Sequence, residues 1–219
     1  MPGKEDIIKT RTDLSPYLFH FIKKDGPKTL RKILTDLKLT SPYGRVCFTE
    51  MPLSGARNMF EYFNSKPKPM YLPYGICFPR ELLRSKYNAL PVLTIQSNNE
   101  KKLIDSSLHW RIELLNDTHD FSWLREWRIE GDFDFSNIID KMVVITDKEN
   151  ELSDEIYGYE IDPDYTEHAE SSDFRDSFPN PTKIIYRKFN HMSLTEASSL
   201  NDDNQIKDIV ESQQKNTNV

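Results

Sequence analysis

The chain has 219 residues, of which 37% are hydrophobic and 29% are charged, and its formal net charge is −6. This length suits one domain of ordinary size, and the low apolar content indicates that part of the chain lies outside the core. Such a composition excludes an integral membrane protein and a small disulfide scaffold.

Charge is distributed unevenly along the chain. Residues 1–146 carry 22 basic and 18 acidic side chains, a net of +4, whereas residues 147–176 carry 2 basic and 12 acidic side chains, a net of −10. Residues 177–219 are balanced, with five of each sign. The acidic block at 147–176 is therefore the informative feature, either as a cover for a basic partner surface or as a solvated loop.

Only two cysteines occur, Cys47 and Cys77, and each lies inside an apolar run. Without paired spacing or a Cys/His cluster, they predict buried free thiols and no metal site. The first residues lack the apolar core of a secretion signal, and no apolar run approaches the roughly 20 residues that span a bilayer. We therefore expect a cytoplasmic protein with no membrane partner.

The first elements alternate short apolar runs with amphipathic segments. After an N-terminal extension over 1–15, "PYLFHFI" (16–22) predicts a strand. Pro27 begins a helix in which apolar residues repeat at helical spacing. Its opposite, basic face has two interpretations, a contact with a phosphate backbone or a solvated surface. Next come strands at 44–50, 74–78 and 89–95, a helix capped by Ser54, and a short helix opened by Pro79.

The second half of the chain continues with short strands. Residues 97–120 resemble a polar helix or an insertion, and strands are predicted at 121–135, 141–146 and 182–189. The acidic block lacks periodicity and is expected to be an exposed loop. One early helix followed by many short strands indicates an α+β domain and not a doubly wound sheet.

The domain is expected to end near residue 192. "SLTE" (193–196) matches a capping box, in which Ser and Glu bond each other's backbone N–H groups. The sequence after it is polar and rich in Asn and Gln. It predicts a C-terminal tail over 193–219, first helical and then disordered, behind a single domain at 16–192.

The stretch "FSWLREWRIEGDFDF" (121–135) places charges among aromatic residues. As a strand, it separates Phe121, Trp123, Arg125, Trp127 and Ile129 from Ser122, Leu124, Glu126, Arg128 and Glu130. Flanking aromatics would desolvate the Glu126 carboxylate, while Arg128 on the same face would stabilise its charge. Glu126 is therefore a candidate general base or a stabiliser of a cationic transition state. The alternative is a structural Glu–Arg pair on an edge strand.

Other polar residues lie at the strands predicted before it. His20 shares one face of the first strand with Leu18 and Ile22, as a satisfied core residue or as a functional one. Arg45 and Thr49 share a face of the second strand. The third strand begins with Tyr74 before Gly75, where a missing side chain allows close approach of a ligand or a neighbouring backbone.

Five short motifs occur in the order found in the AbiGi-like abortive-infection proteins. They are "LFHFIKKDGPKTLRKILTDLKL", "VCFTEMPLS", "PYGICFPRELL", "ALPVL" and "EWRI". The resemblance covers roughly residues 16–146 and extends to a related bacterial family with a similar Glu-Trp-Arg strand. It implies a bacterial phage-resistance or toxin–antitoxin context.

The start of the chain is also similar, more distantly, to the ADP-ribosyltransferases, including the DNA-modifying DarT toxins. This resemblance rests on "LFHF", a helix ending in "ILTDLKL" and a strand reading "VCFT". In those families an aromatic residue or His on the first strand helps to hold NAD, a Tyr, Thr or Arg follows on the second, and a late strand supplies a catalytic Glu. By position, these roles fall to His20, to Arg45 or Thr49, and to Glu126.

The resemblance implies an ADP-ribosyltransferase-like split β-sheet with flanking helices, and NAD as a substrate. Glu126 and His20 would then be catalytic, in a protein that modifies nucleic acid or protein during anti-phage defence. Arg128 would orient Glu126 or grip phosphate. His20 and Glu126 facing one cleft would support this site, and opposite faces would exclude it. The residues expected to bind NAD are His20, Arg45, Thr49, Tyr74 and Arg128.

A second hypothesis is a catalytically inactive relative. Leu124 stands where many transferases carry Gln or Glu, two residues before the catalytic position. The chain would then be an antitoxin or regulator that binds a basic partner through its acidic segment at 147–176. Under the two hypotheses the expected partners are a toxin, an antitoxin, a phage trigger or nucleic acid.

Overall fold

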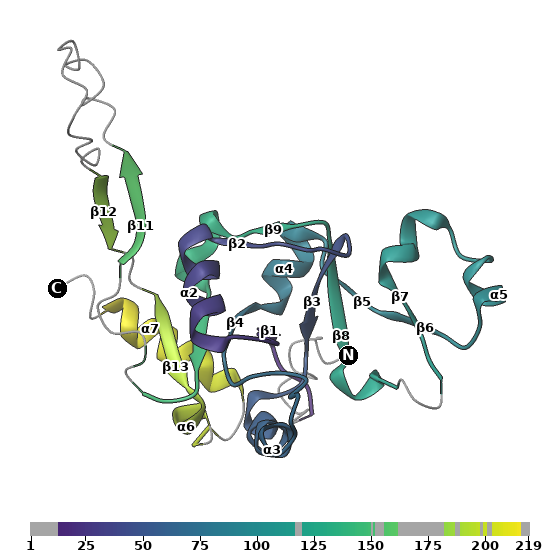
Figure 1. The fold of residues 1–219 in the computed structure, drawn as a ribbon, viewed down its shortest axis with the longest axis horizontal. Coiled ribbons are helices and arrows are strands. Elements are labelled where there is room, and N and C mark those ends of the chain that lie inside the picture. The colour runs from purple at the N-terminus through teal and green to yellow at the C-terminus, as the bar shows by residue number, and fades with distance from the viewer. Residues whose placement is uncertain are drawn as a thin grey trace, which may run out of the picture.

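The fold is built on a seven-stranded mixed sheet, in which the strands lie side by side in the order β13–β10–β4–β1–β3–β8–β5 (Figure 1). The computed structural model describes residues 13–116, 120–149, 151, 156–161, 182–186, 189–197, 199–200 and 203–215. Its strands are β1 (Tyr17–Phe21), β2 (Lys38–Leu39), β3 (Arg45–Thr49), β4 (Gly75–Pro79), β5 (Leu90–Pro91), β6 (Leu93–Ile95), β7 (Ile112–Leu114), β8 (Glu126–Glu130), β9 (Phe133–Asp134), β10 (Val143–Thr146), β11 (Ile156–Ile161), β12 (Thr182–Tyr186) and β13 (Asn190–Ser193).

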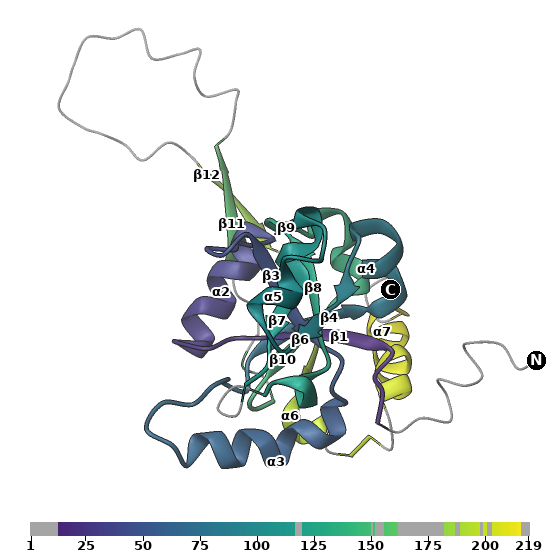
Figure 2. The same ribbon diagram turned by 90° about the vertical axis from the view of Figure 1, so that its right-hand side faces the viewer.

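Helices cover both faces of this sheet, as Figures 1 and 2 show. The α-helices are α2 (Gly26–Asp36), α3 (Leu53–Asn64), α4 (Arg80–Tyr87), α5 (Asn98–Lys101), α6 (Leu194–Ala197) and α7 (Ile206–Lys215). Short 3₁₀ helices are η1 (Ser106–Arg111), η2 (Ser122–Leu124), η3 (Ser136–Lys141) and η5 (Asp203–Gln205). The structure thus confirms a mixed α+β architecture. No helix in the described part of the chain has the length and apolar character that a membrane crossing requires.

Strand alternation divides the core into two clusters, one on each face of the sheet. On the first face, Leu18 and Phe48 pack with Leu30 and Leu34 of α2 and with Leu83 of α4. The second face is covered by α3, α6 and α7, and its cluster contains Phe19, Phe21, Cys77, Leu53, Phe60, Met192, Leu194, Ile206 and Val210. Both cysteines are free thiols, as expected, and Cys77 is buried while Cys47 is half-buried.

The sheet consists of two well-paired halves that meet at one residue pair. β1 and β4 share five pairs, as do β3 and β8, but β1 and β3 are joined only at Phe19 and Thr49. Beyond this point the Nδ1 atom of His20 lies 2.9 Å from the Cys47 carbonyl oxygen, where a regular ladder would continue. A close approach occurs on the other side of β1, where a Cβ added to Gly75 would lie 2.4 Å from the His20 carbonyl oxygen.

The strand predicted at 121–135 begins only at Glu126. Residues 122–124 form η2, and Arg125 has a left-handed backbone with φ of 47°. The expected alternation therefore holds from β8 onward, where Trp127 and Ile129 face the first cluster and Glu126 and Arg128 face the opposite side. Before Glu126, the backbone N–H groups of Leu124 and Arg125 bond within the 3₁₀ turn and not to a neighbouring strand. The period-two pattern therefore does not apply there.

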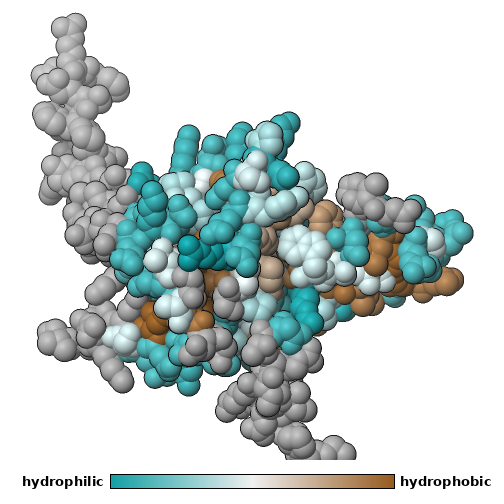
Figure 3. Space-filling model, turned by 90° about the horizontal axis from the view of Figure 1, so that it is seen from below, coloured by the Kyte–Doolittle hydropathy of each residue, from teal (hydrophilic) through white to brown (hydrophobic). Residues whose placement is uncertain are grey.

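A small lobe replaces the polar helix considered for residues 97–120. The strand predicted at 89–95 is broken into β5 and β6, and β6 pairs in parallel with β7. Between them lie the single-turn helix α5 and the 3₁₀ helix η1. Apolar residues remain on its surface, with Leu103 88% and Leu114 36% exposed, and Figure 3 shows strong hydrophobic colour at this end of the molecule.

The acidic block contains a strand that periodicity did not predict. β11 pairs antiparallel with β12, and the two project from the body as a hairpin (Figure 2). Most of the block at 147–176 lies outside the described residues, as do residues 1–12 of the N-terminal extension. The hypothesis of an acidic partner-binding loop therefore stays a prediction.

The C-terminal segment is more ordered than its composition suggests. The capping box is confirmed, because Ser193 Oγ accepts from the Glu196 backbone N at 3.1 Å and Glu196 Oε2 accepts from the Ser193 backbone N at 2.7 Å. After it, α7 inserts Ile206 and Val210 into the second core cluster. The part of the tail that was expected to be disordered thus contains an amphipathic helix over Ile206–Lys215, whose apolar residues are buried against the core.

Candidate functional site

A cavity of about 290 Å³ opens at the start of β8, between the β5 edge, η2 and the β6–β7 lobe. It lies where β8 begins, near the edge of the sheet. Its lining includes Glu126 and Trp127, whose side chains point to opposite faces of the sheet. We call it the Glu126 cavity, and its lining residues are Glu50, Pro91, Val92, Thr94, Glu113, Leu115, Phe121, Ser122, Arg125, Glu126 and Trp127. Three carboxylates, one guanidinium and two aromatic side chains are thus gathered at one opening.

The guanidinium of Arg128 lies behind this cavity and joins β8 to the lobe. Its side chain is 2% exposed, its Nε donates to Glu126 Oε1 at 2.5 Å, and its Nη2 donates to Glu113. Its Nη1 donates to the carbonyl oxygens of Ile112 at 2.8 Å and Trp110 at 3.2 Å. Burial opposes the charge, but the two carboxylates outweigh it and raise the pKa of Arg128. Arg128 therefore orients Glu126 and does not face the solvent as a phosphate-gripping group would.

A second buried ion pair lies beside the cavity. Arg80 of α4 donates through Nη1 to Glu50, and both residues are under 9% exposed. The other carboxylate oxygen of Glu50 accepts from the Trp127 indole Nε1 at 3.0 Å. Glu50 is thus the centre of a buried network and not the solvated turn residue that its place before Met51 and Pro52 suggests.

The Glu126 carboxylate also has neighbours on β3. In the β3–β8 register, Thr49 lies opposite Glu126 and Cys47 opposite Arg128. Burial, with the adjacent charge of Glu126, raises the pKa of the Cys47 thiol to about 11. The same two causes raise the pKa of Tyr71 above its ordinary value. Because both groups stay protonated at neutral pH, neither thiolate nor phenolate chemistry is expected here.

His20 lies on the opposite face of the sheet from Glu126. Phe19 is paired with Thr49, so alternation turns the next residue of β1 to the other side. The His20 ring makes an edge contact with Phe48 of the first core cluster, with 5.9 Å between ring centroids. The structure therefore does not bring His20 and Glu126 to one cleft, and His20 does not line the Glu126 cavity.

The remaining NAD-binding candidates are divided in the same way. Arg45 and Thr49 lie on the face of Glu126, but Thr49 is buried and donates its hydroxyl to the Leu124 carbonyl oxygen. Tyr74 packs on the opposite face against Gly26, and its hydroxyl lies 3.3 Å from Glu151 Oε1. Of the six predicted site residues, only Glu126 lines the cavity, with Arg128 behind it.

His20 gives a measurable pH dependence of stability. Burial lowers its pKa, against the bond to Cys47 and helped by the charge of Lys23. The unfolded chain, with an ordinary His pKa of about 6.5, then binds the proton more readily. The contribution of neutral His20 is therefore complete above that value and declines as the pH falls below it. We expect His20→Gln to lose this part of the decline in urea titrations between about pH 5 and 8.

The other four histidines are the same in both proteins and serve as an internal control. Equal slopes of unfolding free energy against pH in the two proteins would contradict the assignment.

Four charged residues of the site were not among the residues predicted from the sequence: Glu50, Glu113, Arg125 and Arg80. Glu113 lies in the lobe, for which the sequence suggested a polar helix, and its partner Arg128 is 15 residues away. Arg125 Nη2 lies 2.9 Å from Asp13 Oδ2. The backbone of Arg125 is left-handed because it ends the η2 turn. The signal available in the sequence for Arg80 was an Arg directly after Pro79, where the predicted short helix begins.

Comparison with known proteins identifies no relative. No protein-family model, no curated protein and no solved structure matches this chain. Among the described residues, His, Cys, Asp and Glu side chains form no group of three arranged to hold a metal ion. The chemistry of the Glu126 cavity must therefore be argued from its own charges and rings.

Proposed function

We propose that this chain is a binding protein whose Glu126 cavity receives a compact organic cation, the guanidinium or ammonium group of a partner's basic side chain. The observation that carries the proposal is the sharing of Arg128 by two carboxylates that both line the cavity. This cluster has a net charge of −1. The other lining charges are balanced, Glu50 by Arg80 and Arg125 by Asp13.

The aromatic walls favour the same class of ligand. Trp127 and Phe121 line the cavity together with these carboxylates. A cation over an aromatic face is attracted by the ring quadrupole, and more strongly where water is excluded. A cavity of about 290 Å³ accommodates one side chain and not a folded segment. In the anti-phage context implied by the motif order, the partner would be a toxin, an antitoxin or a phage protein with an exposed Arg or Lys.

The test compares charged and neutral ligands of one shape. We expect arginine methyl ester to bind in calorimetric titrations and citrulline methyl ester, its neutral isostere, to bind at least ~10-fold more weakly. Glu113→Gln should remove the arginine binding, because Arg128 is then balanced by Glu126 alone. Glu130→Gln is the matched control, since this exposed carboxylate ends the same strand outside the cavity. Equal binding of the two esters would refute the proposal.

A second candidate function is the NAD-dependent transfer of ADP-ribose. The observation in its favour is that Glu126 lines the cavity with a fixed orientation, and the nicotinamide ring of NAD is itself a flat cation. In such a reaction the ribose–nicotinamide bond breaks, the electron pair leaves with nicotinamide, and Glu126 stabilises the oxocarbenium-like state before water or an acceptor hydroxyl attacks. The His20 part of the original hypothesis is not retained.

The two candidates give separable results. Nicotinamide released from NAD by the wild-type protein and by Glu130→Gln, but not by Glu126→Gln, would establish that Glu126 takes part in the cleavage of NAD, the first step of the transfer. With no release and no change of melting temperature in NAD, the transferase is excluded. The arginine-binding proposal is then judged by its own titrations.

A further inference from the structure

Four aromatic side chains form a connected cluster beside the Glu126 cavity, on surface that the cavity does not use. Phe63 is its centre, with ring-centroid distances of 6.0 Å to Tyr62, 6.4 Å to Tyr71 and 6.5 Å to Trp123. The four residues come from three segments, the end of α3, the loop after it and η2. Tyr62 remains 60% exposed and Trp123 43% exposed.

Lysines are placed over these rings. Lys66 Nζ lies 4.6 Å from the centroid of the Tyr62 ring, and Lys23 Nζ lies 5.5 Å from that of Tyr71. Lys24, directly after Lys23, and Lys68, two residues after Lys66, are also exposed. We call the aromatic–lysine surface the set Lys23, Lys24, Tyr62, Phe63, Lys66, Lys68, Tyr71 and Trp123.

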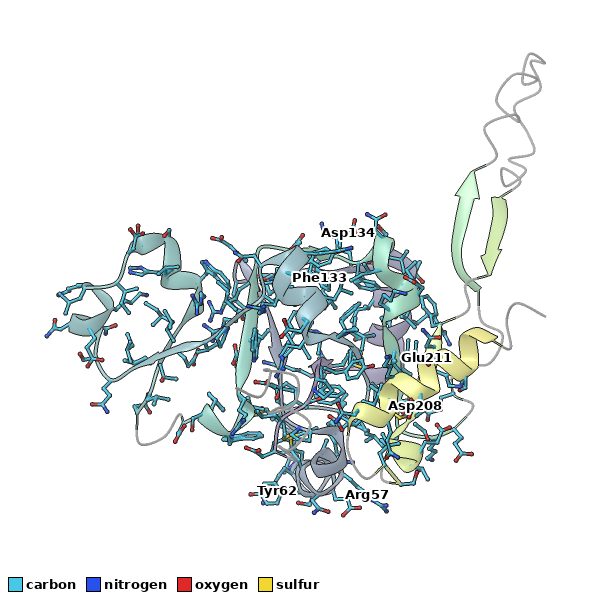
Figure 4. The ribbon with its side chains drawn as sticks, turned by 180° about the vertical axis from the view of Figure 1, so that it is seen from behind. Arg57, Tyr62, Phe133, Asp134, Asp208 and Glu211 are labelled. Atoms are coloured by element: carbon cyan, nitrogen blue, oxygen red, sulfur yellow. The ribbon has the colours of Figure 1, made fainter. Side chains whose placement is uncertain are left out.

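The residues named for this surface carry four positive charges and no negative one, and the acidic groups beside them are Asp25, next to Lys24, and Glu126, near Tyr71. The segment from Tyr62 to Tyr71 contains two lysines and no acidic residue. The nearest carboxylate on α3, Glu61, lies 3.0 Å from Arg57 Nε and is neutralised there. Figure 4 shows Tyr62 projecting from α3 away from Arg57, toward the side of the β6–β7 lobe.

The loop that carries the lysines is held in place by backbone bonds. The Leu72 backbone N donates to the Ile22 carbonyl oxygen at 2.7 Å, and the Ile22 backbone N donates to that of Tyr74 at 2.8 Å. Pro67, between Lys66 and Lys68, and Pro69, directly after Lys68, restrict the backbone of the loop. The surface is therefore largely preformed, and little conformational entropy is lost when a ligand orders it.

We infer that the aromatic–lysine surface binds single-stranded nucleic acid. Exposed rings offer stacking platforms to unpaired bases, and lysines between them neutralise phosphates. Stacking requires exposed faces of the bases, and in a paired duplex these faces are covered by the neighbouring base pairs. A partner protein's apolar segment would instead require a continuous apolar patch, which the interleaved lysines interrupt. This inference stands on contacts separate from those of the proposed cation pocket.

The test is a fluorescence-anisotropy titration of the full chain with labelled oligomers of thymidine or uridine, about 12 nucleotides long. We expect binding at low salt and weaker binding of a duplex of the same length. Tyr62→Ala and Trp123→Ala should each weaken it by ~5- to 100-fold, since stacking of one base contributes at this scale. Trp123→Tyr should largely retain binding. The thymidine and uridine arms identify which nucleic acid is preferred, and binding of either supports the inference.

Lysine substitutions give an independent readout. Lys66→Gln with Lys68→Gln should reduce the slope of log affinity against log salt by ~1.4, the value for two single-strand phosphate contacts. Tyr43→Ala is the control for a lost exposed aromatic, because Tyr43 is 81% exposed outside this surface. No binding at low salt, a preference for duplex, or equal effects of Tyr43→Ala and Tyr62→Ala would overturn the inference. All five substituted side chains are exposed, so each variant is expected to fold, which circular dichroism checks.

Discussion

Replacing Arg128 by Met is expected to destabilise the fold by about 3–5 kcal/mol, the cost of removing one partner from a buried ion pair. Its guanidinium is 2% exposed and joins Glu126 of β8 to Glu113 of β7. It also donates to the carbonyl oxygens of Trp110 and Ile112. Methionine fills similar space but leaves two carboxylates and two carbonyl groups without this donor. At roughly 2–4 °C per kcal/mol, the melting temperature should fall clearly.

The origin of this loss can be separated from simple loss of packing. Adding Glu113→Gln and Glu126→Gln to Arg128→Met removes the two uncompensated charges, so the triple variant should recover part of the stability in urea titrations. Arg57→Met, at a side chain 58% exposed on α3, is the control and should change stability by no more than about 0.5 kcal/mol. If Arg128→Met lowered the free energy of unfolding by less than about 1 kcal/mol, the buried ion pairs of Arg128 would not stabilise the fold as described.

Arg80→Met is expected to cost a similar amount, about 3–5 kcal/mol. Arg80 is 5% exposed, and its Nη1 donates to Glu50 and, at 3.3 Å, to the Ser15 carbonyl oxygen. Without it, the buried Glu50 carboxylate would keep the hydrogen bond from the Trp127 indole but lose the positive charge that balances it. The measurement is again the free energy of unfolding in urea.

A double-mutant cycle with Glu50→Gln tests whether the two side chains act as a pair. We expect a coupling energy of about 0.5–3 kcal/mol between the two substitutions. Arg84→Met is the matched control on α4, since its side chain is 50% exposed and bonded to an exposed Glu81. If Arg80→Met and Arg84→Met had equal effects, the buried network would not be stabilising as described.

Local pattern predicted much of the fold. The strands at β1, β3, β4 and β10 and the amphipathic helix α2 follow from apolar spacing, which depends only on neighbouring residues. The capping box at Ser193 and Glu196 was equally legible, because both bonds lie within four residues. Local pattern failed where backbone geometry or burial came from elsewhere, as in η2 and in α7, whose apolar face is covered by the sheet.

The candidate site depended on contacts that no local pattern contains. Periodicity placed Glu126 and Arg128 on one face of a strand, and the structure agrees. It could not place Glu113 or Arg80, which are brought to Arg128 and Glu50 by folding across 15 and 30 residues.

By itself, the sequence determined which residues share a face within each strand, because side chains alternate along any extended backbone. It therefore placed His20 with Leu18, and Glu126 with Arg128. Only the tertiary structure decided how those faces combine, through the register of β1 on β3 and of β3 on β8. A shift of one residue in either register would have exchanged the faces and brought His20 and Glu126 together. The pairing observed sets them apart and leaves Glu126 in a cavity of carboxylates and aromatic rings.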